Sequence, residues 1–96
     1  MRIRFLAPAR DELKSAVHYY NSERPGLGKE LRSEVRSALK LILSHPNAWQ
    51  AFGKDTRRCV VNRFPYGIVY QLRQDEILVV AVMHLHRDPE YWHERL

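Results

Sequence analysis

Two histidines and an arginine lie close together near the C-terminus, in the sequence His84-Leu85-His86-Arg87. Residues i and i+2 of a strand project to the same face, so the two imidazoles are expected to point the same way. An imidazole titrates near neutral pH and can exchange protons with a ribose hydroxyl and a leaving oxygen. Arg87 would stabilise the charge that builds on a phosphate. The segment is therefore a candidate ribonuclease site.

The same histidines have two other interpretations. In a structural role, one of them would donate to a backbone carbonyl while the other lay in solvent. In a metal site, His93 would be the third ligand, but no cysteine or suitably spaced carboxylate completes the set. The sequence also lacks a P-loop, a Gly-rich dinucleotide motif and a Ser/His/Asp pattern. We therefore expect neither a metal nor another cofactor.

Two aromatic residues follow this segment, Tyr91 and Trp92. Aromatic rings of this kind stack on the bases of single-stranded RNA. They also serve to attach a terminal helix to a sheet, which is the commoner use of buried aromatic side chains. Both interpretations place the two residues next to the histidine segment.

The most basic segment spans residues 54–73, where five cations stand against the single acid Asp55. Such cations neutralise nucleic-acid phosphates, and side chains on an open sheet can approach nucleotides. Charged residues also protect exposed sheet edges from pairing with other chains. Both interpretations stay open. The candidate nucleic-acid-binding residues are Lys54, Arg57, Arg58, Arg63 and Arg73.

Length and composition limit the kind of chain this is. With 96 residues, of which 45% are hydrophobic and 28% charged, the sequence suits one folded domain over residues 1–96 and not a disordered chain. The net charge of +5 and the preference for arginine over lysine favour an anionic partner. Surface arginines in ordinary ion pairs would give the same composition, so charge alone does not identify that partner.

No segment of the sequence predicts export or membrane insertion. The longest apolar stretch is the seven residues 77–83, whereas a bilayer span needs about 20. The N-terminal segment has no apolar run of signal-peptide length, and the one cysteine, Cys59, cannot form an internal disulfide. We expect a cytoplasmic protein that does not contact a membrane.

Hydrophobic periodicity and the positions of Pro and Gly predict the elements that must position these residues. A period of two indicates strands, and apolar residues at helical spacing indicate two helices joined by the turn Pro25-Gly26. Trp49 and Phe52 are expected to fold back from a loop onto the core. The predicted elements are a strand over 2–6, helices over 9–23 and 27–44, a loop over 47–56, strands over 57–64, 68–73 and 77–83, and a short helix over 89–96.

This order, βααβββ followed by a short helix, predicts the α+β class. The apolar stripes of the two helices need a surface, and a four-stranded, mostly antiparallel sheet provides it. The strand over 77–83 is apolar on both faces and should lie centrally. The opposite sheet face would stay open to a partner unless the C-terminal helix covers it. The side chains expected on that face are Arg58, Asn62, Gln71, Arg73, His84 and His86.

Three segments of the C-terminal half form a recognisable pattern. They are Arg63-Phe64-Pro65-Tyr66-Gly67-Ile68-Val69-Tyr70, then residues 77–86, then Arg87-Asp88-Pro89-Glu90-Tyr91-Trp92. With the helical hairpin before them, they resemble the RelE/ParE family of bacterial toxins over nearly the whole chain. The resemblance implies a growth-inhibiting toxin of a type II toxin–antitoxin module of the plasmid-stabilisation type. A partly disordered cognate antitoxin would wrap and silence it in a hetero-oligomer.

The resemblance also implies a choice of mechanism, because RelE-like members cut messenger RNA on the ribosome and ParE-like members poison DNA gyrase. Arg87 matches the arginine that ends the last strand of RelE-like members, and Tyr91 matches their C-terminal tyrosine. Residues 60–62 are Val-Val-Asn where those members have alternating lysines, and Gly67 stands in place of their third-strand arginine.

Cleavage of messenger RNA is our first hypothesis, with His84 and His86 as acid and base beside Arg87 and Tyr91. Gyrase poisoning without nuclease activity is the alternative, and a non-catalytic nucleic-acid-binding module is the second alternative. The expected partners are the cognate antitoxin and either the ribosome with its messenger RNA or DNA gyrase.

Overall fold

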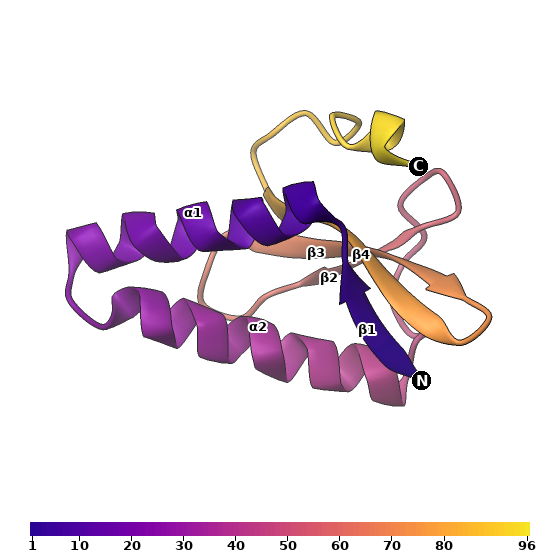
Figure 1. Ribbon diagram of the computed structural model, residues 1–96, viewed down its shortest axis with the longest axis horizontal. Coiled ribbons are helices and arrows are strands. Elements are labelled where there is room, and N and C mark those ends of the chain that lie inside the picture. Colours follow the sequence, from indigo (N-terminus) through magenta and orange to yellow (C-terminus); the bar gives the residue numbers. More distant parts are fainter.

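The computed structural model describes residues 1–96 as two helices packed on one face of a four-stranded sheet (Figure 1). The α+β class and the predicted order of helices and strands are confirmed. No helix is long and apolar enough to cross a membrane. The elements are β1 (Arg2–Phe5), α1 (Ala7–Glu23), α2 (Leu27–Ser44), β2 (Arg57–Val60), β3 (Tyr66–Arg73), β4 (Glu76–His84) and the 3-10 helix η1 (His93–Arg95).

The sheet has the strand order β1-β4-β3-β2. β1 runs parallel to β4, and the other two pairings are antiparallel, so the sheet is mostly antiparallel as predicted. β4 lies between β1 and β3, and every residue from Ile77 to Met83 is buried. The apolar run that predicted a central strand is therefore explained by burial on both faces of the sheet.

Close contact between the two helices depends on Gly28, at the start of α2. Its N–H donates to Asn21 Oδ1 of α1 over 2.8 Å. A Cβ atom at this position would lie 2.7 Å from Asn21 Cγ and would also meet the carbonyl of Val17. The turn before it uses Gly26 with φ of +89°, a conformation that suits glycine. These two glycines fix the angle of the helical hairpin.

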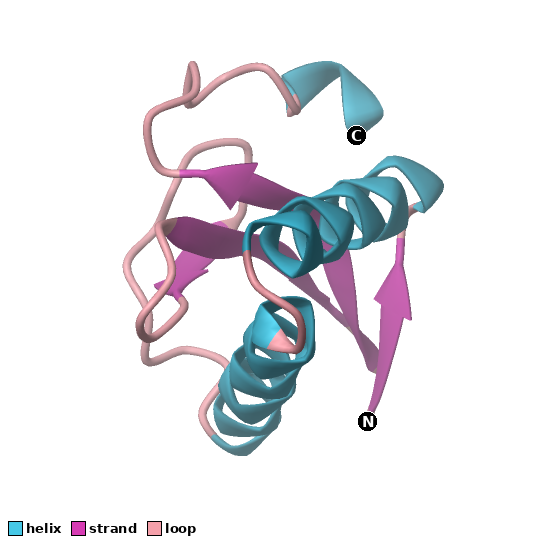
Figure 2. Cartoon of the chain, turned by 90° about the vertical axis from the view of Figure 1, so that its left-hand side faces the viewer, coloured by secondary structure: helices cyan, strands magenta, loops and turns pink.

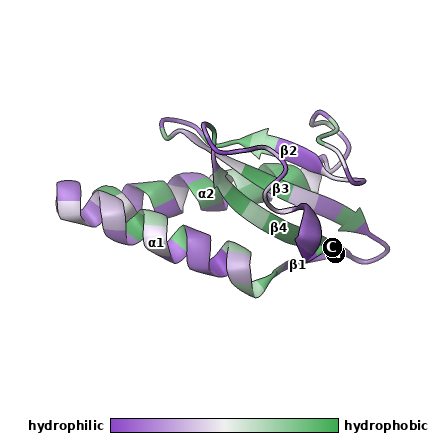
Figure 3. Ribbon diagram, turned by 90° about the horizontal axis from the view of Figure 1, so that it is seen from above, coloured by the Kyte–Doolittle hydropathy of each residue, from purple (hydrophilic) through white to green (hydrophobic).

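Apolar side chains form two clusters, one on each face of the sheet. The larger cluster lies between the helices and the sheet, where Leu31, Ile42 and Ile68 are fully buried. The smaller cluster lies on the opposite face, where Trp92 covers β4 and stacks on Phe52. The C-terminal segment passes over the sheet on the side away from α2 (Figure 2). Hydrophobic side chains of β3 and β4 therefore pack on both faces of the sheet. Figure 3 shows the hydrophobic stretch of β4.

The expectation that the sheet face opposite the helices stays open is wrong, because the smaller cluster covers it. The expected C-terminal helix over 89–96 is also absent. Turns replace it, beginning where Asp88 Oδ1 accepts the N–H of Glu90 over 2.9 Å, and only the single 3-10 turn η1 follows. A short terminal helix has few internal hydrogen bonds to offset the cost of nucleation, and burial of Trp92 determines the path of the segment instead.

A β-bulge in β4 changes which face its last residues occupy. Val69 pairs with Ala81 and Tyr70 pairs with Val79, so Val80 has no partner in β3. Val80 and Ala81 both belong to the smaller cluster, and Val82 returns to the larger one. Strict alternation had placed His84 on the face opposite the helices. The bulge instead turns it to the helical face, where it pairs with Tyr66.

The strand predicted over 57–64 is shorter than expected, because β2 ends at Val60. The chain then bends, and Arg63 adopts a left-handed conformation with φ of +70°. The N–H of Val61 bonds to the carbonyl of Tyr66 over 2.8 Å and closes this bend before β3 begins. Arg63 is therefore not on the same strand as Arg57 and Arg58.

Candidate functional site

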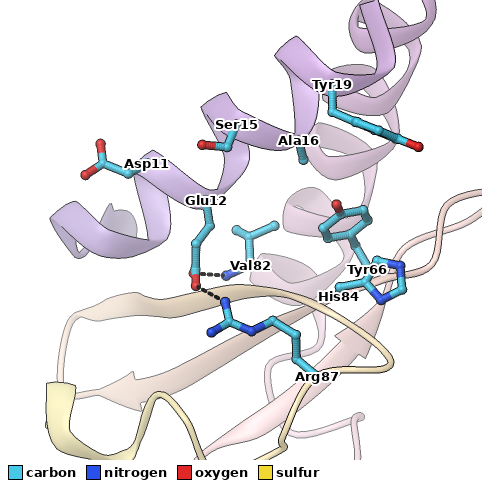
Figure 4. Close-up of a pocket in the computed structure, with 9 residues that line it drawn as sticks. All are labelled: Asp11, Glu12, Ser15, Ala16, Tyr19, Tyr66, Val82, His84 and Arg87. Atoms are coloured by element: carbon cyan, nitrogen blue, oxygen red, sulfur yellow. Dashed lines mark hydrogen bonds and ion pairs between the residues drawn. The ribbon is translucent and has the colours of Figure 1, made fainter. Parts of the chain in front are cut away.

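The side chain of Glu12 is the centre of the site at the end of β4. It extends from α1 toward the sheet, and Oε1 accepts the N–H of Val82 over 3.0 Å. Oε2 accepts the hydroxyl proton of Tyr91 over 2.6 Å. Arg95 donates to both oxygens, over 2.9 Å in each case. One carboxylate therefore joins the first helix, the central strand and the C-terminal segment. Figure 4 shows its contacts with Val82 and Arg87.

Side chains of the hydrogen-bond network around Glu12 supply partners to backbone groups at the exposed edge of β4. β1 stops at Phe5, and the last bond between the two segments runs from the N–H of Leu6 to the carbonyl of Val79. Beyond that point Glu12 accepts from Val82, and Arg95 donates to the carbonyl of Val80 over 3.0 Å. Buried backbone groups need partners, and two side chains supply them where the neighbouring strand has ended.

The contacts of Glu12 fix the protonation of the groups around it. Partial burial would raise the pKa of Glu12, but hydrogen bonds from Arg95, Tyr91 and Val82 together hold it below its usual value. Burial and the hydrogen bond to the Glu12 carboxylate both raise the pKa of Tyr91. Tyr91 is thus held protonated as a donor to Glu12, which does not suit it to act as a general base.

Arg87 is held beside the same carboxylate but keeps part of its surface in solvent. Its Nη1 lies 3.8 Å from Glu12 Oε2, and its guanidinium lies 3.6 Å from the centre of the Tyr91 ring. The side chain is 55% exposed. A planar cation held against an aromatic face in this way can contact an anionic group of a partner.

His84 and His86 lie together, with ring centres 5.1 Å apart. His84 Nδ1 accepts the backbone N–H of His86 over 3.1 Å. A nitrogen that accepts cannot carry a proton, so the proton of neutral His84 is on Nε2. The Tyr66 ring lies edge-on to His84 at 5.2 Å, whereas the side chain of His86 is exposed.

A cleft of about 360 Å³ opens between α1 and the ends of β3 and β4. Arg87 and His84 lie on its sheet side, and the carboxylate of Glu12 separates Arg87 from the helix (Figure 4). The structure thus brings together all four candidate catalytic residues, because His86 adjoins His84 and Tyr91 adjoins Arg87. The residues that line the cleft are Asp11, Glu12, Ser15, Ala16, Tyr19, Tyr66, Val82, His84 and Arg87.

Glu12 is the site residue that the sequence did not predict. It is 70 residues away from Val82 along the chain, and no local motif connects the two. The only available signal was a carboxylate on the predicted first helix, one position before the buried Leu13. That signal does not distinguish Glu12 from an ordinary solvent-exposed acid.

The candidate nucleic-acid-binding residues do not form one surface. Arg57 donates to the carbonyl of Trp49 on the helical side of the sheet. Arg63 pairs with Glu30 and Glu34 of α2, at 2.6 and 3.5 Å. These two arginines therefore have partners within the chain.

The remaining three members, Lys54, Arg58 and Arg73, lie outside the helical face. Lys54 donates to the carbonyl of His93 over 3.1 Å, and Arg73 donates to Gln71 Oε1 over 2.8 Å. Arg58 pairs with Val69 of the smaller cluster and holds its guanidinium 4.2 Å from the centre of the Phe52 ring.

Arg58 explains why Gly67 stands where RelE-like members have an arginine. A Cβ atom at Gly67 would lie 2.9 Å from Arg58 Cδ and 3.0 Å from Arg58 Cγ. The side chain of Arg58 therefore crosses β3 over the glycine. A larger residue at position 67 would displace it from Phe52.

This α+β fold, with a helical hairpin on one face of a sheet of strand order β1-β4-β3-β2, is that of the RelE/ParE-like toxins. Residues 3–89 match the family model described as ParE toxin of type II toxin–antitoxin system, parDE. The chain therefore belongs to the ParE toxin family, which confirms the toxin–antitoxin function that the resemblance implied. Its partner is a cognate antitoxin.

The fold is shared with a solved structure titled "Chromosomal ParDE TA system from P. aeruginosa". The TM-score is 0.78 at 13% sequence identity, and the match covers 90% of this chain and 97% of that chain. A comparison with curated proteins found no match.

Proposed function

We propose that this toxin stops growth by poisoning DNA gyrase and does not cleave RNA. The proposal reverses the order of the two hypotheses that the sequence left open. It rests on membership of the ParE family and on one observation, the engagement of Tyr91 and Arg87 by the Glu12 carboxylate. The proposal also places the toxin in the cytoplasm, where its antitoxin and gyrase are made.

The chemistry of the site favours gyrase poisoning over RNA cleavage. A ribonuclease needs a base to deprotonate the attacking hydroxyl and an acid for the leaving oxygen. Tyr91 is held protonated by Glu12, and Arg63 and Arg57 are directed to intramolecular partners. The basic side chains that would hold messenger RNA are therefore dispersed, whereas gyrase poisoning by a bound protein requires no proton transfer by the toxin.

One observation keeps the ribonuclease as a second candidate. His84 and His86 lie 5.1 Å apart at the mouth of the cleft, and Arg87 is partly exposed beside them. In a cleavage reaction His86 would accept the proton of the ribose hydroxyl. His84 would supply a proton to the leaving oxygen only as an imidazolium, and a proton on its Nδ1 replaces the hydrogen bond that this nitrogen accepts from the His86 N–H. This candidate therefore depends on both imidazoles.

The test is pulse labelling during the first minutes after expression of the toxin without its antitoxin. We expect incorporation of thymidine into DNA to fall before incorporation of methionine into protein. Purified toxin, gyrase and supercoiled plasmid should then yield linear DNA after denaturation of gyrase. Early loss of protein synthesis with intact DNA synthesis would contradict the proposal and favour the ribonuclease.

Single substitutions provide the matched comparison. His84→Ala and His86→Ala should each retain growth inhibition within about threefold, because neither imidazole performs chemistry in the proposed mechanism. A ribonuclease that used them as acid and base would lose on the order of 100-fold or more in cleavage rate. Loss of toxicity in both variants, with unchanged folding by circular dichroism, would support the ribonuclease.

A further inference from the structure

The solvent-facing side of α2 carries a continuous row of polar side chains. Consecutive residues of an α-helix are about 100° apart around its axis, and the buried residues Leu31, Val35 and Ile42 mark the side of α2 that faces the sheet. Figure 1 shows α2 along one edge of the molecule. The exposed residues on the opposite side, which we call the α2 stripe, are Lys29, Arg32, Ser33, Arg36, Ser37 and Lys40.

The four cations of the α2 stripe have no acidic partner within the chain. Every ion pair of the chain involves an arginine outside the stripe. The two acids of α2, Glu30 and Glu34, lie on the flank of the helix next to Arg63 and pair with it. The cations of the stripe therefore repel one another, and a partner with several negative charges would supply the missing counter-charges.

The length and composition of the α2 stripe fit the backbone of duplex DNA. From Lys29 to Lys40 the helix rises by about 16 Å. One strand of a duplex carries a phosphate about every 3.4 Å along the axis, so this length can face about five phosphates. Lysine and arginine neutralise phosphates, and hydroxyls such as those of Ser33 and Ser37 donate to phosphate oxygens. Every residue of the stripe can therefore contact the backbone.

Other anionic partners fit the α2 stripe less well. The stripe has no aromatic residue, whereas proteins that hold single-stranded nucleic acid stack its bases on aromatic rings. The core of an interface between proteins is apolar and depleted in charge, whereas the stripe is polar throughout. The cleft that holds His84 contains no residue of α2, so a nucleic acid on the stripe is not presented to the imidazoles.

We propose that the α2 stripe of the free toxin binds the phosphate backbone of the duplex DNA that gyrase holds. This inference rests on the proposed gyrase mechanism and makes DNA a part of the target. Contacts with the DNA and with the enzyme at the same time would give the toxin a higher affinity for the gyrase–DNA complex than for gyrase alone.

The salt dependence of duplex binding tests the α2 stripe without gyrase. Fluorescence anisotropy of a labelled duplex should give the wild type a slope of log K against log salt concentration of about −3.6, because four neutralised phosphates contribute about −0.9 each. The stripe variant, Arg36→Gln with Lys40→Gln, should reduce the steepness of this slope by about 2 and weaken binding at low salt at least about tenfold.

The control variant is Arg2→Gln with Arg24→Gln. It removes the same net charge from exposed arginines that already have carboxylate partners, Glu76 and Glu30. Its slope should stay within about 0.5 of the wild-type value, because neither arginine belongs to the α2 stripe. Circular dichroism confirms that both variants are folded.

Three results of the binding experiment would overturn the proposal. The first is an equal slope for the wild type and the stripe variant. The second is an equal loss in the stripe variant and the control variant, because binding would then follow net charge and not the α2 stripe. The third is tighter binding of a single strand than of the duplex, because the stripe has no ring on which bases could stack.

DNA cleavage by gyrase gives a second readout. The stripe variant should need at least about tenfold more toxin than the wild type to yield the same amount of linear plasmid, and the control variant should stay within about threefold. Weaker binding of the stripe variant to gyrase without DNA, with unchanged duplex binding, would overturn the proposal, because the stripe would then contact protein. If the wild type yields no linear plasmid, the gyrase mechanism itself fails, so the two failures are distinguishable.

Discussion

At the scale of single residues, Glu12 accepts a backbone hydrogen bond from β4 that a neighbouring strand would otherwise accept. Its carboxylate binds the free N–H of Val82 and, through Arg95 and Tyr91, holds the C-terminal segment against the sheet. The candidate site is thus partly a structural joint. This dual character explains why residue types alone predicted a catalytic cluster here: tyrosine, arginine and histidine serve equally in a hydrogen-bonded joint and in an active site.

Glu12→Gln should lower the free energy of unfolding by about 2 kcal/mol. The amide keeps the shape of the side chain but leaves Arg95, whose side chain is only 19% exposed, without its anionic partner. Urea unfolding measures the loss. The control Asp11→Asn alters an exposed neighbouring carboxylate and should change stability by no more than about 0.5 kcal/mol. Equal stability of both variants would show that the network contributes little.

The four catalytic candidates differ in how far sequence could predict them. The adjacency of His84 and His86 follows from their spacing, and it is present in the structure. The face that they occupy could not be predicted, because the bulge at Val80 depends on pairing with β3 and not on the local pattern. Likewise, Tyr91 as a donor to Glu12 depends on a contact 79 residues away along the chain.

At the scale of elements, periodicity predicted both helices and the central strand because each has a continuous apolar pattern to bury. It failed where a tertiary contact determines the backbone. β2 stops at Val60 because the chain turns back into β3, and the C-terminal segment follows the burial of Trp92 rather than its own helix-start signal at Asp88. Short segments have little local free energy to resist such contacts.

Gly28→Ala tests the packing of the helical hairpin. An added methyl group would meet Asn21 and the carbonyl of Val17, so the helices must separate or Asn21 must lose its bond to the Gly28 N–H. We expect a loss of about 2 kcal/mol in the free energy of unfolding. Ser33→Ala, at an exposed position of the same helix, should be neutral or slightly stabilising. A stable Gly28→Ala variant would contradict the close approach.

At the scale of the whole molecule, acid should weaken the attachment of the C-terminal segment. The folded-state pKa of Glu12 is held below its ordinary value, so the ionised network stabilises the protein above the unfolded-state pKa and loses that effect as pH falls through the folded-state value. The free energy of unfolding should therefore decrease between about pH 5 and about pH 3. Tryptophan fluorescence measures it, and Glu12→Gln should show a smaller decrease over this range.

The antitoxin should stabilise the folded toxin as a whole. A chain of 96 residues exposes a large share of its surface, and the antitoxin covers part of that surface. A partner that binds only the folded state at 100 times its Kd adds about 2.7 kcal/mol to the free energy of unfolding, which in a domain of this size raises the Tm by roughly 10 °C or more.

Differential scanning fluorimetry of the toxin, alone and with a titrated antitoxin, checks this shift. The Tm should rise with each addition of antitoxin, because the antitoxin binds the folded toxin and not the unfolded chain. A Tm that stays constant as the antitoxin is added would contradict this expectation, because binding to the folded state alone must raise the free energy of unfolding.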